Sequence, residues 1–240
     1  MPVNSILLSK EQFVLKSFQS YYNKTEQTKF LEQLIKPHLS PGTNVLDACC
    51  GGGESAYFLS KLQPQATFLG VDVDQTALEL AQKQISPSAA VKFEIADVNQ
   101  LKRIYGPKSF DLVLCMKTLS WLPAFEETLT NLLAVTRRHV FLSSLFYDGW
   151  IDFEIKVKEH AKIWSDFSWY NIYSFPRFVE FCGQKGAKRV IGHDFKIGID
   201  LPKPDNPDLM GTYTIRQYDG DRLQISGALL MPWKIVQIDV

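Results

Sequence analysis

The most chemically informative stretch of the sequence is the glycine-rich run VLDACCGGGESA, which extends from Val45 to Ala56. Asp47 lies near the end of a short apolar segment, and three consecutive glycines, residues 51–53, precede a segment with helical character. Glycine in such a turn lets a ligand approach the backbone closely, and the first N–H groups of a helix have no partner inside the helix. The run therefore predicts a ligand-binding loop, and a tight turn that binds nothing is the alternative.

Two classes of ligand fit this loop. The spacing Gly51-x-Gly53-x-x-Ala56 matches the dinucleotide fingerprint G-x-G-x-x-A, which would make the chain an NAD-binding oxidoreductase. Asp47 argues against NAD, because a carboxylate directly ahead of the loop repels a pyrophosphate and attracts a cation. S-adenosylmethionine (SAM) carries a sulfonium and an α-amino group, so the acidic residue favours SAM.

The run resembles motif I of the class I (Rossmann-like) SAM-dependent methyltransferases, whose common form is V-L-D-x-G-x-G-x-G. Asp47, Gly51 and Gly53 fall on matching positions, whereas Cys49 replaces the first glycine of the motif. The resemblance, to enzymes of the small-molecule type, implies that these four residues bind the cofactor. The departure at residue 49 requires a backbone φ that cysteine can adopt.

A second strand-end acid agrees with the same family. The segment FLGVD, residues 68–72, resembles the family's second strand, and this implies that Asp72 accepts hydrogen bonds from the ribose hydroxyls of the cofactor. Val73 would then flank the adenine. Asp74 is the rival acid, but it directly precedes a helical pattern, so we expect it to cap that helix. A turn aspartate is the alternative role of Asp72.

Two further segments follow in the family's order. Asp97 and Val98 come after the third expected strand and resemble the adenine-edge segment, in which Asp97 would accept a hydrogen bond from the adenine amino group. The segment SFDLVLC, residues 109–115, resembles the fourth strand, so Cys115 is expected to lie against the cofactor. A capping aspartate and a buried apolar cysteine are the alternative roles. The resemblance covers about residues 40–146.

An aromatic-rich segment, residues 146–182, follows the fifth expected strand, where this family commonly builds its acceptor pocket. Tyr147, Trp150, Tyr170 and Tyr173 are predicted to wall that pocket, because aromatic side chains combine large apolar faces with polar tips. A buried core made of the same side chains is the alternative. The family's nucleic-acid amino methyltransferases carry an Asn/Asp-Pro-Pro-aromatic tetrad after the fourth strand, and its absence here favours a small-molecule acceptor.

The sequence names no catalytic base. Lys117, Asp148, His160 and His193 are candidates, because a base helps when the acceptor is a hydroxyl. Each also has a structural role available on a solvated face, in a turn or in a strand. The four cysteines form no CxxC pair, so we expect neither a metal site nor a disulfide framework.

The elements that must position these residues alternate along the chain. Five short apolar strands separated by helical stretches indicate βαβ units with a parallel sheet that is covered on both faces. Asp219-Gly220 between two strand-like runs predicts a hairpin. The fold class expected is α/β, a doubly wound Rossmann-like sheet of seven mostly parallel strands with antiparallel C-terminal strands. The five strands are expected at residues 44–47, 66–71, 91–95, 110–116 and 140–146.

Two regions are expected along the chain. Residues 1–40 form an N-terminal helical lid or extension, and residues 41–240 form the methyltransferase domain. Within that domain the cofactor half comprises residues 41–146, and the acceptor-side insertion and C-terminal strands comprise residues 147–240.

Composition limits the partners. The 240 residues include 26 basic and 26 acidic side chains, so net charge gives no reason to expect a nucleic acid or an anionic membrane as partner. No apolar run approaches the ~20 residues of a transmembrane helix, and the first ten residues hold no signal-peptide core. We therefore expect a cytoplasmic protein, monomeric or homodimeric.

Together these observations predict a SAM-dependent methyltransferase that transfers a methyl group to a small-molecule acceptor and releases S-adenosylhomocysteine (SAH). The acceptor group is expected to be a hydroxyl on a sugar, a natural product or a quinone-like ring. The NAD-binding oxidoreductase and a methyltransferase-like binding module without catalysis are the alternatives.

Overall fold

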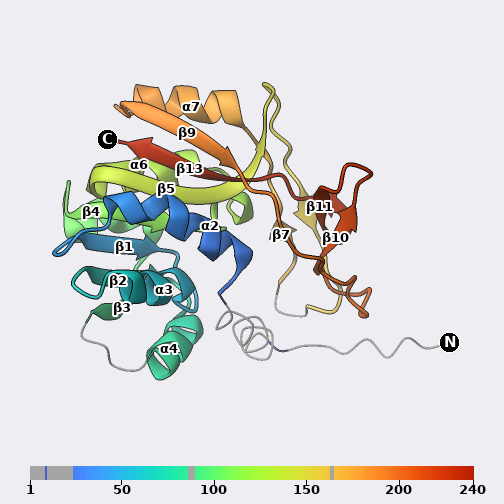
Figure 1. Ribbon diagram of the computed structural model, residues 1–240, viewed down its shortest axis with the longest axis horizontal. Coiled ribbons are helices and arrows are strands. Elements are labelled where there is room, and N and C mark those ends of the chain that lie inside the picture. Colours follow the sequence, from blue (N-terminus) through green and yellow to red (C-terminus); the bar gives the residue numbers. More distant parts are fainter. Residues whose placement is uncertain (1–8, 10–23, 86–89, 163–164) are drawn as a thin grey trace.

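The central element of the fold is a parallel sheet with one reversed strand. The structure, a computed structural model, describes Ser9 and residues 24–85, 90–162 and 165–240. The strands of the sheet are β1 (Asn44–Ala48), β2 (Thr67–Asp72), β3 (Val91–Ile95), β4 (Phe110–Cys115), β5 (Thr136–Tyr147), β8 (Tyr173–Ser174), β9 (Arg189–Asp194) and β13 (Trp233–Asp239). In the described residues the order is β3-β2-β1-β4-β5-β13-β9, with β8 beside β5 (Figure 1). Strand β13 runs antiparallel to both neighbours, and the other strand pairs described in this sheet are parallel. The predicted mostly parallel sheet with an antiparallel C-terminal strand is therefore confirmed.

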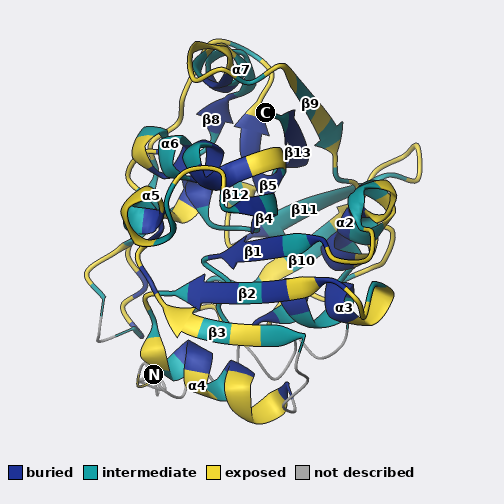
Figure 2. Cartoon of the chain, turned by 90° about the vertical axis from the view of Figure 1, so that its left-hand side faces the viewer, coloured by how far each residue is buried: buried dark blue, intermediate teal, exposed yellow. Residues whose placement is uncertain are grey.

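Helices cover both faces of this sheet (Figure 2). They are α2 (Glu26–Ile35), α3 (Glu54–Leu62), α4 (Gln75–Gln84), α5 (Leu101–Tyr105), α6 (Glu126–Val135) and α7 (Phe175–Gln184), with 3-10 turns η2 (Lys36–His38), η3 (Val98–Gln100) and η4 (Leu119–Trp121). Helices α2 and α3 share an apolar cluster with one face of the sheet, and α5, α6 and α7 share a second cluster with the other face. The layering is therefore the α/β/α arrangement of a doubly wound fold.

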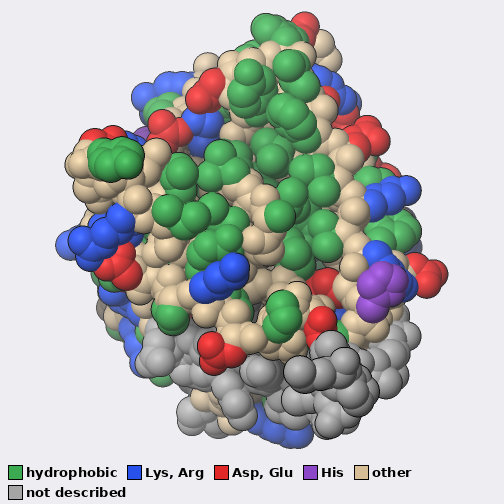
Figure 3. Space-filling view, turned by 90° about the vertical axis from the view of Figure 1, so that its right-hand side faces the viewer, with side chains coloured by type: hydrophobic (Ala, Val, Ile, Leu, Met, Phe, Trp, Pro, Cys, Tyr) green, Lys and Arg blue, Asp and Glu red, His purple; other side chains and the backbone are tan. Residues whose placement is uncertain are grey.

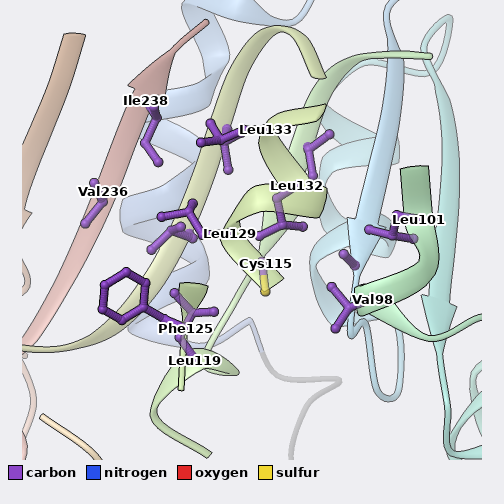
Figure 4. Close-up of a cluster of buried hydrophobic side chains, with 14 of the residues drawn as sticks. Val98, Leu101, Cys115, Leu119, Phe125, Leu129, Leu132, Leu133, Val236 and Ile238 are labelled. Carbon is purple, nitrogen blue, oxygen red and sulfur yellow. The ribbon is translucent and has the colours of Figure 1, made fainter. Parts of the chain in front are cut away.

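The two clusters explain why the inner strands are almost wholly apolar. Alternate side chains of a strand point to opposite faces, so Val45 joins the α2–α3 cluster and Leu46 joins the other. Figure 4 shows part of the second cluster, in which Leu129 of α6 belongs with Val236 and Ile238 of β13. Because both faces are covered, polar residues are confined mainly to the strand ends.

The strand order reverses at β1, and this reversal decides where a ligand can bind. Strand β1 pairs with β2 on one side and with β4 on the other. The chain connections leaving these strands diverge there, so a crevice opens at their carboxyl ends, and ligands of open α/β sheets bind in such crevices. The glycine-rich loop follows β1 directly at this point.

A second, smaller sheet follows β9. It contains β10 (Thr212–Arg216), β11 (Arg222–Ser226) and β12 (Leu229–Leu230), while β6 (Lys156–Val157) and β7 (Ser168–Trp169) form a separate short pair. Strands β10 and β11 are antiparallel, and Gly220 in their connection has a φ of +90°. The predicted hairpin around Asp219-Gly220 is therefore confirmed.

Strand β9 ends at Asp194, although the alternation of apolar with polar or small residues, which predicts a strand, continues to residue 199. Of the expected N-terminal lid, Ser9 and residues 24–40, with α2 and η2, belong to the described residues, and the rest lies outside them. Among the described helices, none combines the length and hydrophobicity that a bilayer-spanning segment requires.

A chain of hydrogen bonds joins His38, His139 and Asp239. Asp239 Oδ1 lies 2.8 Å from His139 Nδ1, so this nitrogen donates and His139 Nε2 is left as the acceptor for His38 Nδ1, 3.1 Å away. Burial, followed by the neighbouring His139, lowers the pKa of His38 below 6.5. The folded state thus favours the neutral ring of His38.

Because of these hydrogen bonds, we expect the free energy of unfolding to decrease in mild acid. The contribution of neutral His38 is present above pH 6.5 and is lost as the pH falls through the lowered folded-state pKa. His38→Phe should remove a hydrogen bond worth about 1 kcal/mol at pH 7.5 and flatten the loss between pH 6.5 and 5. Urea unfolding at pH 7.5, 6.5 and 5 measures the free energy of unfolding, and His160→Asn, at an exposed position, is the control. An unchanged slope in His38→Phe would contradict the assignment.

Candidate functional site

A cavity of about 920 Å³ lies at the carboxyl ends of β1 and β4. Residues 24–27, at the start of α2, line one side of it. The side next to the sheet is lined by Asp47, Cys49, Cys50, Gly51, Gly52, Glu54, Ser55, Met116, Lys117 and Thr118. The glycine-rich loop that the sequence predicted to bind a ligand therefore belongs to this cavity.

The loop after β1 contains three residues with a left-handed backbone. The φ angle is +56° at Cys49, +51° at Gly51 and +75° at Gly53. Glycine adopts this conformation freely, whereas residues with a Cβ rarely do. A Cβ on Gly53 would also lie 2.6 Å from the ring of Phe93. Cys49, at the position of the motif's first glycine, therefore adopts a left-handed conformation that is uncommon for a residue with a Cβ.

Asp47 is buried near the end of β1 and lines the cavity. Its Oδ2 accepts a hydrogen bond from the backbone N–H of Ala56, in α3, at 3.1 Å. Burial raises the pKa of Asp47 to about 7; the Ala56 N–H opposes this rise, and the nearby carboxylates of Asp72 and Glu54 add to it. A cation bound beside Asp47 would stabilise the ionised form.

Asp72, at the end of β2, holds the loop from the neighbouring strand. Its Oδ2 accepts from the N–H of Gly51 at 2.8 Å, and its Oδ1 accepts from the N–H of Asp74 at 2.9 Å. A carboxylate has about four lone-pair sites, so acceptor capacity remains for a ligand. Asp74 accepts from the N–H of Ala77 and caps α4, which confirms the role expected for it.

The predicted adenine-side residues lie at the ends of β2 and β3. Val73 is exposed, and Val98 is buried. Asp97 is exposed and accepts from the N–H of Asn99 at 2.9 Å, so it caps the turn η3. None of the three lines the cavity, and their contact with adenine stays a prediction.

Cys115 lies inside the protein rather than at the cavity surface. It is fully buried among the apolar side chains drawn in Figure 4. A hydrogen bond between the thiols of Cys49 and Cys115, together with burial, raises the pKa of Cys49 well above its usual value. The thiol of Cys49 is therefore neutral, and Cys49 is the member of the pair that lines the cavity.

Glu54 is a cavity residue that sequence reasoning missed. Its Oε1 accepts from the N–H of Thr25 at 3.2 Å and from the hydroxyl of Thr28 at 2.6 Å, and its Oε2 lies 3.5 Å from Lys117 Nζ. One carboxylate thus ties together the starts of α2 and α3 and the residues after β4. Its place directly after the glycines was a signal that the sequence did offer.

The four predicted acceptor-side aromatics separate in the structure. Tyr170 is buried and lines the cavity, with its ring edge-on to Trp121 at a centroid distance of 4.2 Å. Tyr173 is buried elsewhere, and its hydroxyl donates to the carbonyl of Leu119 at 3.0 Å. Tyr147 and Trp150 are exposed and do not line the cavity.

The remaining wall of the cavity is mainly apolar and comes largely from the C-terminal third of the chain, where the polar side chains of Thr212, Gln224 and Ser226 also line it. Large apolar residues alternate with polar or small ones over 195–201, but this pattern alone does not place them in the site. The structure brings them together with residues of the following loops: Phe195, Ile197, Ile199, Leu201, Met210, Met231 and Trp233.

Of the four candidate bases, Lys117 alone lines the cavity. His160 is exposed, and exposed Asp148 pairs with Lys234 at 3.0 Å. His193 is half-buried in β9, and burial lowers its pKa. Within the described residues no cluster of three or more His, Cys, Asp or Glu side chains could hold a metal ion.

Comparison with known proteins identifies the domain. A family model described as a methyltransferase domain matches residues 39–185. The chain is 36% identical over 92 residues to trans-aconitate 2-methyltransferase of Deinococcus radiodurans, covering 38% of this chain and 33% of that protein. It is 23% identical over 141 residues to demethylmenaquinone methyltransferase of Shouchella clausii, covering 54% of this chain and 60% of that protein. The matched segments thus span only 33% to 60% of these two relatives.

Solved structures agree with this assignment at the level of the fold. Magnesium protoporphyrin IX methyltransferase from Synechocystis PCC 6803, solved with bound SAH, matches with a TM-score of 0.56 at 16% identity, over 95% of this chain and 87% of that chain. The matched model covers the glycine loop, the strand-end acids and Tyr170. The chain therefore belongs to the methyltransferase-domain family, the class I SAM-dependent methyltransferases, whose methyl donor is S-adenosylmethionine.

Proposed function

We propose that the chain transfers a methyl group from SAM to a hydroxyl of a small molecule and releases SAH. The observation that carries this proposal is the cavity itself, because one continuous wall joins the glycine loop to aromatic and apolar side chains. The names of the two curated relatives, which act on trans-aconitate and demethylmenaquinone, support a small-molecule acceptor.

The carboxylates of the site suit SAM. Asp72 has acceptor capacity left for ribose hydroxyls, and Asp97, with Val73 and Val98, lies at the next strand end, where the adenine is proposed to bind. Asp47 suits the cationic methionine part, because its ionised form lacks a charge partner strong enough to keep its pKa low. Bound there, SAM supplies a methyl group on an electrophilic sulfonium.

The chain's own contribution is positioning. Thr118 and Tyr170 line the cavity and carry hydroxyls that can donate to or accept from an acceptor hydroxyl. Holding the acceptor oxygen in line with the methyl group can supply much of the rate, and burial of the acceptor keeps water away. The catalytic base stays unassigned. The start of α2, tied to Glu54, is proposed to act with the preceding residues as a lid over this site.

Calorimetric titration with SAM, SAH and NAD tests the proposal. We expect micromolar binding of SAM and SAH, since the site is matched to a cation beside Asp47, and no heat from NAD. Binding of NAD alone would favour the oxidoreductase alternative. No binding of any of the three would favour the non-catalytic module, and Cys49→Gly would then show whether the strained loop is the cause.

The compartment and assembly state complete the proposal. All four cysteines are free, which supports a reducing compartment such as the cytoplasm. We propose a monomer or homodimer, with no nucleic-acid partner, and size-exclusion chromatography with light scattering tests the assembly state.

A further inference from the structure

The apolar wall of the cavity is formed by residues that lie outside the segment matched by the family model. The family match ends at residue 185, whereas the apolar wall defined above, Phe195 to Trp233, lies wholly beyond it. The family match therefore includes Thr118 and Tyr170, proposed above to meet the acceptor hydroxyl, but not the apolar wall. The kind of acceptor that this wall favours therefore follows from the chemistry of its own side chains.

The segment 195–201 presents one apolar edge to the cavity and one polar edge to the outside. Phe195, Ile197, Ile199 and Leu201 line the cavity, whereas the alternate residues of the segment do not. No regular strand forms here, but the residues that line the cavity still alternate with those that do not. The two edges therefore have separate tasks.

The outer edge fastens the segment to the β10–β11 hairpin. Lys196 Nζ pairs with Asp221, and Asp200 pairs with Arg216 and with Arg222, whose Nε lies 2.7 Å from its Oδ1. These pairs are exposed, so each is weak on its own, but they converge on one hairpin. The apolar edge is thereby held toward the cavity.

Backbone contacts add to this attachment. The N–H of Leu201 donates to the hydroxyl of Thr214 at 2.8 Å, and the N–H of Thr214 donates to the carbonyl of Leu201 at 3.1 Å. Ile199 nevertheless stays 45% exposed in a cavity wall that also contains the buried Met231 and Trp233. Exposed apolar surface that continues a ligand cavity is typical of a binding site.

Charged groups near this wall are paired with one another. Lys162 lines the cavity, and its ammonium pairs with Glu159, whose side chain is almost fully buried. Glu159 Oε1 also accepts from the N–H of Met210 at 2.7 Å. Among the described residues, the Lys162–Glu159 pair therefore leaves no net charge in this part of the cavity for an ionic acceptor.

A view of the same side of the molecule agrees with this description. Figure 3 shows hydrophobic side chains gathered across the face on which β7, β10 and β11 lie in Figure 1. Apart from Thr212, Gln224 and Ser226, this wall gives a polar sugar few groups to bond with, and each unpaired hydroxyl costs free energy when it leaves water.

We propose that the acceptor is an uncharged lipophilic molecule, a hydroxylated ring that carries an extended apolar chain or ring system. The hydroxyl head lies at the glycine-loop end, and the apolar body lies along Phe195, Ile197, Ile199 and Leu201. This proposal rests on the proposed function and narrows it: of the acceptors expected above, it keeps quinone-like rings and apolar natural products and leaves out sugars.

A series of 4-alkylphenols, from methyl to heptyl, tests the proposal on the SAH-saturated protein by calorimetry. Burial of each added methylene should tighten binding about fourfold for as long as the chain stays against the wall. Ile199→Asp should weaken 4-heptylphenol binding at least tenfold and leave 4-methylphenol binding nearly unchanged. SAH affinity should not change, because SAH is proposed to bind at the carboxyl ends of β1, β2 and β3, whereas Ile199 belongs to the proposed acceptor wall.

Ile215→Asp is the matched control. Ile215 is also 45% exposed and lies on β10, but it does not line the cavity, so its variant should bind 4-heptylphenol as the wild type does. An equal loss in both variants, a flat chain-length series, or tighter binding of methyl β-glucoside than of 4-heptylphenol would overturn the proposal. Failure of SAH itself to bind would instead refute the proposed function.

Discussion

Replacing Asp72 with alanine is expected to weaken SAM binding about 100-fold or more while the chain stays folded. The carboxylate is proposed to hold the ribose through one or two charge-assisted hydrogen bonds, worth roughly 1.5–3 kcal/mol each. Each 1.4 kcal/mol changes the affinity about tenfold. The Oδ2 atom also fastens the glycine loop through Gly51 N–H at 2.8 Å, so its loss loosens the loop as well. Calorimetry with SAM and SAH measures both affinities.

Two variants separate ribose binding from structural effects. Asp74→Ala removes the cap of α4, so it should cost about 1 kcal/mol of stability and leave SAM affinity within about twofold of wild type. Asp72→Asn keeps one acceptor oxygen and should give an intermediate affinity. If Asp72→Ala bound SAM as tightly as wild type, Asp72 would not be the ribose acid.

The second large effect is expected at Asp47, where asparagine should stabilise the ligand-free protein. The folded-state pKa of Asp47 is raised from 3.8 to about 7, chiefly by burial. The stability that the neutral carboxyl gives below pH 3.8 is therefore lost as the pH rises through 7. Three pKa units correspond to about 4 kcal/mol. Because asparagine does not ionise, its stabilising effect should be small at pH 4 and reach about 4 kcal/mol above pH 7.

The same substitution should weaken SAM binding. Wild-type affinity should fall by up to about tenfold per pH unit below pH 7, because the carboxylate takes up a proton and no longer attracts the cation. Asp47→Asn should bind SAM weakly and without this pH dependence. Calorimetry between pH 6 and 8.5 measures the difference, and urea unfolding at pH 4, 6 and 8 measures stability.

Asp111 provides a control of opposite sign. Burial alone would raise its pKa, but the Asn44 N–H and the Arg137 guanidinium outweigh burial and lower it. Its stabilising contribution is thus present above pH 3.8 and is lost as the pH falls, so Asp111→Asn should destabilise the protein at pH 7. If Asp47→Asn did not stabilise the protein at pH 8, ionisation of Asp47 would not destabilise the folded state.

Local pattern was sufficient for much of the fold. Each inner strand is buried on both faces, so its apolar run is visible without knowledge of its neighbours, and the glycines after Asp47 mark the loop for the same reason. Asp74 could be assigned as a helix cap because the residues that it caps follow it directly. The Asp219-Gly220 hairpin is likewise a property of a few adjacent residues.

The acceptor side could not be derived in this way. Twelve aromatic residues cluster in the segment 146–182, but aromatic rings serve cores and pockets equally well, and Tyr170 reaches the cavity while Tyr173 does not. Nothing in the sequence shows that Ile199 meets the same space as Cys49, 150 residues earlier.

Sequence alone therefore determined the family, the order of the cofactor motifs and the parallel sheet, because these depend on residues close together in the chain. Only the tertiary structure decided which apolar side chains close the cavity, since that depends on how β13 and the β10–β11 hairpin return to the carboxyl edge of the sheet. It also decided the protonation of Asp47, because the pKa of a carboxyl depends on the water that distant residues exclude.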